Sequence, residues 1–143
     1  MQPHVGAAQH RRDAHLRRLQ QIQRDRGSRR QNLEAVRRIP AGNGVYNLGV
    51  SPDGSLLVAT NKRDASVSIF STGTAKELAR LPTKRKVLHG VAITPDSRYA
   101  FITVEGVGSE PGTVEIIDLK SLTTVATVDT PSQAAGIDFW KMD

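Results

Sequence analysis

Cysteine is absent from this 143-residue sequence. Its absence excludes a disulfide framework, Cys-ligated zinc and covalently attached c-type haem. No apolar run approaches the roughly 18 residues of a membrane span. The N-terminus lacks the apolar core of about 7–15 residues that a secretory signal requires. With this start, the product is expected to remain in the cytoplasm, although the lack of Cys does not itself decide the compartment.

Sequence motifs of common enzyme classes are also missing. There is no Gly-x-Ser-x-Gly elbow, no phosphate-binding Gly-x-x-x-x-Gly-Lys loop and no His-Glu-x-x-His metal motif. Gly106-Val107-Gly108-Ser109 is Gly-rich, but no helix is expected after it, and a phosphate site of that type needs one. No catalytic residue is assigned, and no cofactor is expected.

Basic charge is concentrated in the first quarter of the chain. Residues 1–38 hold ten Arg against three acidic residues, for a net charge of +7, whereas the other ten basic residues face eleven acidic ones. Residues 1–31 are rich in Arg, Gln and His and offer only a thin apolar stripe at Leu16, Leu19 and Ile22. Such a stripe buries too little to offset chain entropy. We expect a basic leader, disordered or weakly helical, before a second region at 32–143.

The second region contains a repeat. Ser51-Pro52-Asp53-Gly54 returns 43 residues later as Thr94-Pro95-Asp96-Ser97, and the flanking apolar segments return with it. Ser, Pro, Asp and Gly in succession suit the four places of a type I turn. Each unit is expected to hold four strands. We place these strands near 45–50, 55–60, 65–70 and 76–81, and then near 88–93, 98–104, 113–118 and 123–128.

Four-stranded units with this period are typical of β-propeller blades. The predicted fold is all-β: a partial β-propeller of two complete four-stranded antiparallel blades, at about 45–83 and 88–130, plus two orphan strands. Residues 33–39 mirror a last strand, and Ala135–Trp140 mirror Leu88–Ile93, a first strand. A closed ring needs at least about four blades. We therefore expect a C-terminal fragment of a longer propeller gene, with bare apolar faces that favour the remaining blades or self-association. The leader is then a product of truncation or of a wrong reading frame, and blades encoded upstream would test this.

The second strands carry a family resemblance. Val58-Ala59-Thr60-Asn61 and Phe101-Ile102-Thr103-Val104, each preceded by the Ser/Thr-Pro-Asp turn, resemble the Tyr-Val-Thr-Asn (YVTN) signature of bacterial β-propeller repeats. The similarity covers about 33–143 and departs from the signature at Val58, Ala59 and Val104. It implies a propeller of a kind that is often periplasmic or exported. It implies function poorly, because one fold hosts many functions.

Candidate ligand-binding residues lie where the innermost strands begin, at the mouth of a propeller channel. They are Tyr46, Asn47 and His89, with Glu105 after a second strand. A lone His is more often structural than a ligand contact, so the favoured alternative is that these residues cap the strands and bond to backbone, and that Glu105 is a solvated loop carboxylate. One His without a second His or Cys supplies too few ligands for a metal. Lys84-Arg85-Lys86 is interpreted as a solvated basic turn.

The functional interpretation is a truncated, non-enzymatic propeller repeat protein that acts as a scaffold for an unknown ligand or protein. One alternative is a fragment of a propeller enzyme, a lactonase-like hydrolase or a haem d1-like oxidoreductase, with its chemistry near His89. Another is nucleic-acid binding by charge through the leader, although no aromatic residue there offers base stacking.

Overall fold

The computed structural model describes residues 37–142, so the predicted leader at 1–31 lies outside the described residues. The chain divides into two units at Arg38, and the features below belong to the second, from Ile39 onward. The described residues form eight strands and no helix. The strands are β1 (Val45–Val50), β2 (Leu56–Asn61), β3 (Ser66–Ser71), β4 (Glu77–Pro82), β5 (Val87–Ile93), β6 (Tyr99–Glu105), β7 (Gly112–Asp118) and β8 (Thr123–Thr130).

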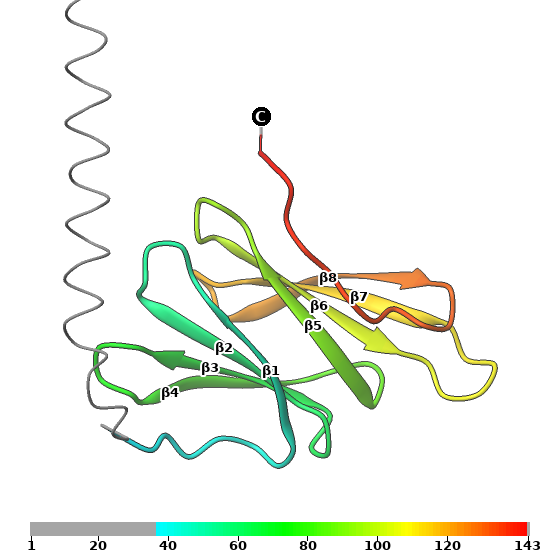
Figure 1. The fold of residues 1–143 in the computed structure, drawn as a ribbon, viewed down its shortest axis with the longest axis horizontal. Coiled ribbons are helices and arrows are strands. Elements are labelled where there is room, and N and C mark those ends of the chain that lie inside the picture. The colour runs from blue at the N-terminus through cyan, green and yellow to red at the C-terminus, as the bar shows by residue number, and fades with distance from the viewer. Residues whose placement is uncertain (1–36, 143) are drawn as a thin grey trace, which may run out of the picture. The chain divides into compact units, whose positions relative to one another are not determined.

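Two separate sheets account for all eight strands. Strands β1 to β4 form one sheet and β5 to β8 the other, each in sequence order and antiparallel throughout. Figure 1 shows the first sheet on the left and the second on the right, with β5 beside the first sheet. The expected pair of four-stranded blades is confirmed, and each expected strand agrees with an observed one to within one or two residues at its ends.

The repeated turn between the first two strands of each blade is built identically. Gly54 N–H donates to Ser51 O (2.7 Å), and Ser97 N–H donates to Thr94 O (2.8 Å). In the first blade, Asp53 accepts hydrogen bonds from Ser51 Oγ and from Ser55 N–H. The second blade repeats this arrangement around Asp96. Short polar side chains that bond to nearby backbone stabilise such turns, which explains why this tetrad marks the repeat.

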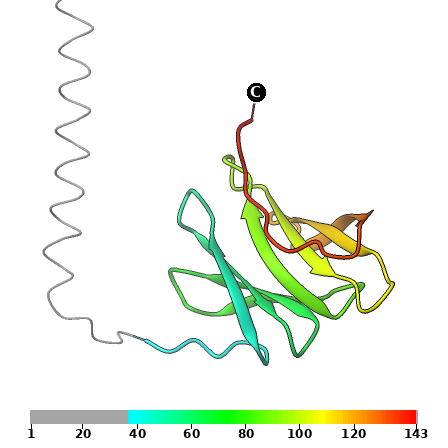
Figure 2. The same ribbon diagram turned by 45° about the vertical axis from the view of Figure 1, so that its right-hand side comes forward.

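Apolar packing joins the two blades along a seam. Its core consists of fully or nearly fully buried residues from β2, β3, β5, β6, β7 and the position just after β7: Val58, Val67, Ile69, Leu88, Ala100, Ile102, Val104, Ile117 and Leu119. Strand β5 lies at this seam, and each of its residues is buried or half-buried. Figure 2 shows the broad ribbon of β5 between β1 and the rest of the second blade. Burial of this apolar surface is the main force that holds the blades together.

The opposite side of the first blade is open. Strand β1 is the counterpart of β5, yet nearly all of it is exposed. A hollow of about 220 Å³ lies on this side and is lined only by apolar side chains: Ile39, Ala41, Val45, Leu48, Leu57, Ala59 and Phe70. Within the part of the chain that the structure describes, no second sheet packs against this face.

The C-terminal segment covers part of the second blade in the manner of a first strand. Thr60 Oγ1 in the first blade donates to His89 O (3.4 Å), and its equivalent Thr103 Oγ1 donates to Ala135 O (2.5 Å). Ala135 therefore occupies the place of His89, not that of Leu88, so the alignment predicted for 135–140 is wrong by one residue. The matching glycines are Gly90 and Gly136.

Neither predicted orphan segment is a strand where it is described, at 37–39 and 135–140. A strand assignment requires a hydrogen-bonded ladder with a neighbour, and neither segment belongs to a ladder among the described residues. The part of the first segment at 33–36 lies outside the described residues.

Gly54 provides a test of the repeated turn. Its φ of +76° lies in the left-handed region, and a Cβ there would meet nothing within 4 Å. Gly54→Ala should therefore lower the free energy of unfolding by about 1 kcal/mol through backbone strain alone. Gly73→Ala is the matched control, because Gly73 is also uncrowded but has no positive φ. Denaturant unfolding of both variants measures the difference, and equal effects would contradict the assignment.

Candidate functional site

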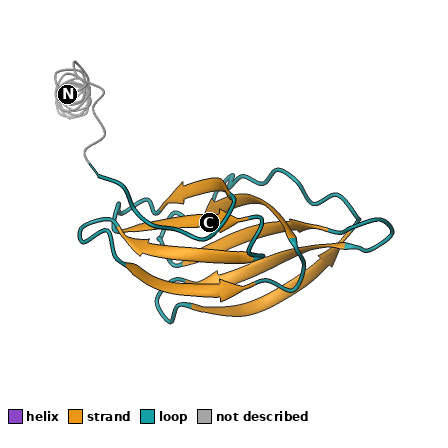
Figure 3. Ribbon diagram, turned by 90° about the horizontal axis from the view of Figure 1, so that it is seen from below, coloured by secondary structure: helices purple, strands orange, loops and turns teal. Residues whose placement is uncertain are grey.

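The features that sequence analysis singled out lie at one end of the strands in each blade. The starts of β1 and β3 pair with the ends of β2 and β4, and the second blade repeats this pattern. The connections at 62–65, 83–86 and 106–111 therefore share this edge, which we call the loop edge. Figure 3 shows the strands of both blades running between two such loop-bearing ends. The Pro-Asp turns occupy the other end.

Irregularities in strand pairing direct Tyr46 and His89. The β1–β2 ladder shifts register between Val45 and Asn47, and the β5–β6 ladder shifts between Leu88 and Val91. Tyr46 and His89 thus fall at β-bulges, which redirect side chains and are common beside functional sites.

A threonine completes each bulge. Asn47 N–H donates to Thr60 Oγ1 (3.0 Å), and Gly90 N–H donates to Thr103 Oγ1 (2.7 Å). These bonds satisfy backbone N–H groups at the point where the ladder is interrupted. The positions of Tyr46 and His89 are therefore fixed by the second strands of their blades.

Three of the four predicted site residues lie in contact with one another. The rings of Tyr46 and His89 meet edge to face, with centroids 4.8 Å apart. His89 Nε2 lies 3.2 Å from Glu105 Oε1, which makes an ion pair when the imidazole is protonated. Tyr46 is 54% exposed, whereas His89 and Glu105 are half-buried. We call Tyr46, His89 and Glu105 the aromatic–acid cluster.

Asn47 does not join this cluster through its side chain. Its Oδ1 accepts a hydrogen bond from the N–H of Leu48 (2.8 Å). The side chain therefore serves the strand itself, as the capping interpretation predicted for this group of residues.

Lys62 extends the cluster and was missed by the sequence analysis. Its Nζ lies 4.5 Å from the centroid of the Tyr46 ring, within the range of a cation–π contact. Lys62 follows β2, and Glu105 ends the equivalent strand β6. The signal that could have found Lys62 is its place in the repeat, one residue after the Thr-Asn pair.

A buried carboxylate fixes the connection that leads into β5. Glu115 is almost fully buried, and its Oε1 accepts a hydrogen bond from Lys84 N–H (2.6 Å). Burial raises the pKa of Glu115 above its ordinary value, and the bond from Lys84 only partly offsets this effect. Ionised Glu115 therefore anchors the connection at a cost in desolvation.

The described residues contain no group of three or more His, Cys, Asp or Glu side chains placed to hold a metal ion. Over that same part of the chain, no helix has the length and apolar character to cross a membrane.

Comparison with known proteins identifies the fold. No protein-family model matches the chain, and neither does any curated protein. Solved structures do match. One is a functionally unknown protein from Desulfotomaculum acetoxidans, with a TM-score of 0.64 and 22% identity over 74% of this chain and 33% of that one.

Two further structures agree. The Swd1 β-propeller domain of Myceliophteria thermophila matches with a TM-score of 0.60 and 16% identity, over 71% of this chain and 30% of that one. Hydrazine synthase of Kuenenia stuttgartiensis matches with a TM-score of 0.59 and 20% identity, over 75% of this chain and 29% of that one. The described blades thus have the β-propeller fold, and this chain spans about a third of the proteins it resembles.

Glu115 and Glu77 should respond oppositely to pH. The raised pKa of Glu115 means that its ionised form disfavours folding, so Glu115→Gln should be more stable than the wild type at neutral pH. That advantage should shrink as the pH falls through the raised pKa, because the wild-type carboxyl then becomes neutral too.

Glu77 provides the matched control. Its pKa is lowered, chiefly by the hydrogen bond from Arg80, so its ionised form stabilises the fold. Glu77→Gln should be less stable than the wild type at neutral pH, and this deficit should fade as the pH falls through the ordinary and then the lowered pKa of Glu77. Thermal unfolding between pH 3 and pH 8 measures both. A stability difference from the wild type that has the same sign in both variants would contradict the assignment.

Proposed function

We propose that this chain is part of a non-enzymatic β-propeller scaffold that binds a protein segment through the loop edge. The observation that carries the proposal is the contact of Tyr46, His89 and Glu105 across the blade seam, with Lys62 over the Tyr46 ring. The cluster combines an exposed aromatic ring with groups of both charge signs. An exposed Tyr of this kind is typical of protein-binding surfaces.

The partners of His89 favour binding over catalysis. A histidine that activates a nucleophile must lie within hydrogen-bond reach of a hydroxyl or thiol. In the described residues His89 instead contacts a carboxylate and an aromatic edge. A rigid pair of this kind is suited to present a donor and an acceptor to a ligand.

The proposal also includes further blades beyond the two that the structure describes. The first blade has a bare apolar face, so we propose that further blades, from a longer chain or from associated copies, complete the ring and the binding surface. We also propose membership of the bacterial Tyr-Val-Thr-Asn repeat family. Its support is that Thr60 and Asn61, the two signature matches in the first blade, each bond to specific partners: Thr60 to β1 and β5, and Asn61 to Ser66 and Ser68.

Selection of peptide ligands tests the scaffold. The full chain is immobilised, peptides are selected from a random library, and their dissociation constants are measured by calorimetry. The double variant Tyr46→Ala with Lys62→Ala should weaken binding of the selected peptides about tenfold or more, since it removes an aromatic anchor and a cation. The control is Arg98→Ala with Lys120→Ala, two residues near the opposite ends of the strands. Equal losses in both variants, or no enriched peptide, would overturn the proposal.

The rival activities give different results. Hydrolysis of p-nitrophenyl acetate or of a simple lactone that disappears in His89→Ala would indicate an enzyme. Salt-dependent DNA binding that is lost on deletion of residues 1–31 would indicate a nucleic-acid binder.

A further inference from the structure

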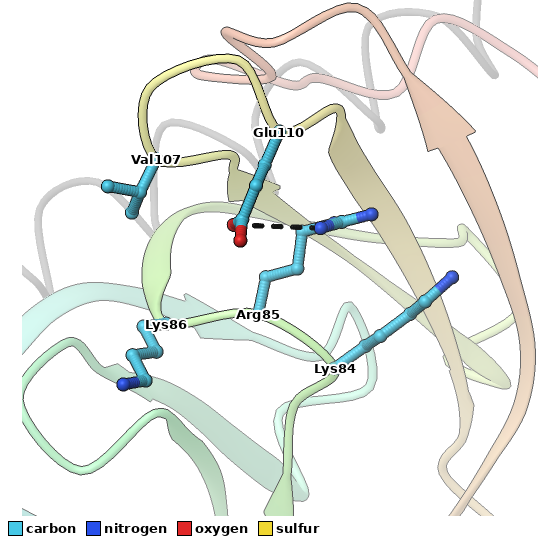
Figure 4. A pocket seen from close by; sticks show the side chains of 5 residues that line it. All are labelled: Lys84, Arg85, Lys86, Val107 and Glu110. Atoms are coloured by element: carbon cyan, nitrogen blue, oxygen red, sulfur yellow. Dashed lines mark ion pairs between the residues drawn. The ribbon is translucent and has the colours of Figure 1, made fainter.

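A second hollow, separate from the apolar one on the first blade, lies on the loop edge at the junction between the blades. It has a volume of about 330 Å³ and is lined by Lys84, Arg85 and Lys86 from the connection before β5, and by Val107 and Glu110 from the loop after β6. In Figure 4, Glu110 extends from its loop toward Arg85, and the two lysines diverge on either side. The turn that was interpreted as a solvated loop therefore forms one wall of a defined cavity.

The guanidinium of Arg85 is largely buried, and both of its ion-pair partners among the described residues lie beyond hydrogen-bond length. Its side chain is only 15% exposed. Nη1 lies 3.7 Å from Glu110 Oε2 and Nη2 lies 3.7 Å from Asp129 Oδ1, both beyond hydrogen-bond length. Nε is covered and has no partner. A guanidinium with five donors and two distant carboxylates retains most of its capacity to bind an oxyanion.

The local charge also favours an anion. Of the three consecutive cations, Lys84 pairs closely with Asp129, at 3.2 Å. Lys86 is exposed and has no ion-pair partner in the part of the chain that the structure describes. Glu110 is the single acidic residue among those that line the hollow. Asp129 lies outside the lining but contacts both Lys84 and Arg85, so the three cations face two carboxylates and retain one excess positive charge.

Both walls of the hollow are held by their own contacts. Besides the bond from Lys84 N–H to Glu115, Thr83 Oγ1 lies within hydrogen-bond distance of Ala65 O (3.0 Å) and of Arg85 O (2.7 Å). On the other side, Gly106 approaches the Glu110 backbone so closely that a Cβ would lie 2.0 Å from Glu110 O. The hollow is thus preformed, which lowers the entropic cost of binding a ligand.

We propose that this hollow binds the oxyanion group of a small ligand, a phosphate or a carboxylate, with Arg85 and Lys86 as its contacts and with Glu110 as a displaceable internal substitute. Glu110 is 58% exposed and stands 3.7 Å from Arg85, so the pair contributes little to stability. An incoming oxyanion that takes its place can approach to hydrogen-bond length while the carboxylate of Glu110 returns to solvent.

Calorimetric titration of the full chain with inorganic phosphate tests this proposal. Arg85→Gln should weaken phosphate binding about tenfold or more, as expected for the loss of a charge-assisted hydrogen bond. Glu110→Gln should strengthen it, because the competing carboxylate is removed. Parallel titrations with acetate distinguish the two sources of the oxyanion: tighter binding of phosphate indicates a phosphate site, and tighter binding of acetate indicates a carboxylate site.

Charge-matched variants away from the hollow serve as controls. Lys76→Gln and Asp138→Asn repeat the charge changes at exposed positions on other parts of the fold. Lys86→Gln provides a second loss-of-binding variant at an exposed position, in case Arg85→Gln does not fold. Binding that changes equally in the controls, or that Glu110→Gln fails to strengthen, would overturn the proposal.

Discussion

Covering both faces of a four-stranded sheet is the constraint on which the rest of this structure depends. A blade with two apolar faces requires a neighbour on each side. Strands β5 and β1 show the difference, because they are equivalent in the repeat but only β5 belongs to a sheet that another described blade precedes. Strand β5 is buried or half-buried along its length, whereas β1 is largely exposed. The chain supplies a partial substitute at its C-terminal end, where the segment around Ala135 lies against β6 through Thr103.

The threonine near the end of each second strand connects this packing to the candidate site. A single hydroxyl accepts from the bulged first strand of its own blade and donates to the segment that begins the next. The hydroxyl that bonds to the following segment is thus the same one that fixes the bulge at Tyr46 or His89. Blade packing and the arrangement of the site cannot vary independently, which accounts for a threonine at both positions.

The strands and turns could be predicted because their causes are local. Pro52 and Asp53 favour the turn whatever lies around them, and the apolar runs on either side determine the strands. The alignment at Ala135 failed because apolar pattern alone cannot distinguish neighbouring registers, and only the bond from Thr103 decides between them. Tyr46, His89 and Glu105 were expected in the same region of the fold, but the contacts among them were not predicted. Lys62 was not identified and Arg85 was interpreted as part of a solvated turn, because their contacts depend on bulges and on loops from separate strands.

The connection from Lys84 to His89 links the two regions of the loop edge. Arg85 lines the hollow and His89 belongs to the aromatic–acid cluster, and only three residues separate them. Glu115 holds the start of this connection, and the buried Leu88 holds its end. Because the segment is held at both ends, its backbone and the side chains between these points have little conformational freedom. The raised pKa of Glu115 indicates that this anchoring has a cost in desolvation, which the hydrogen bond from Lys84 N–H only partly offsets.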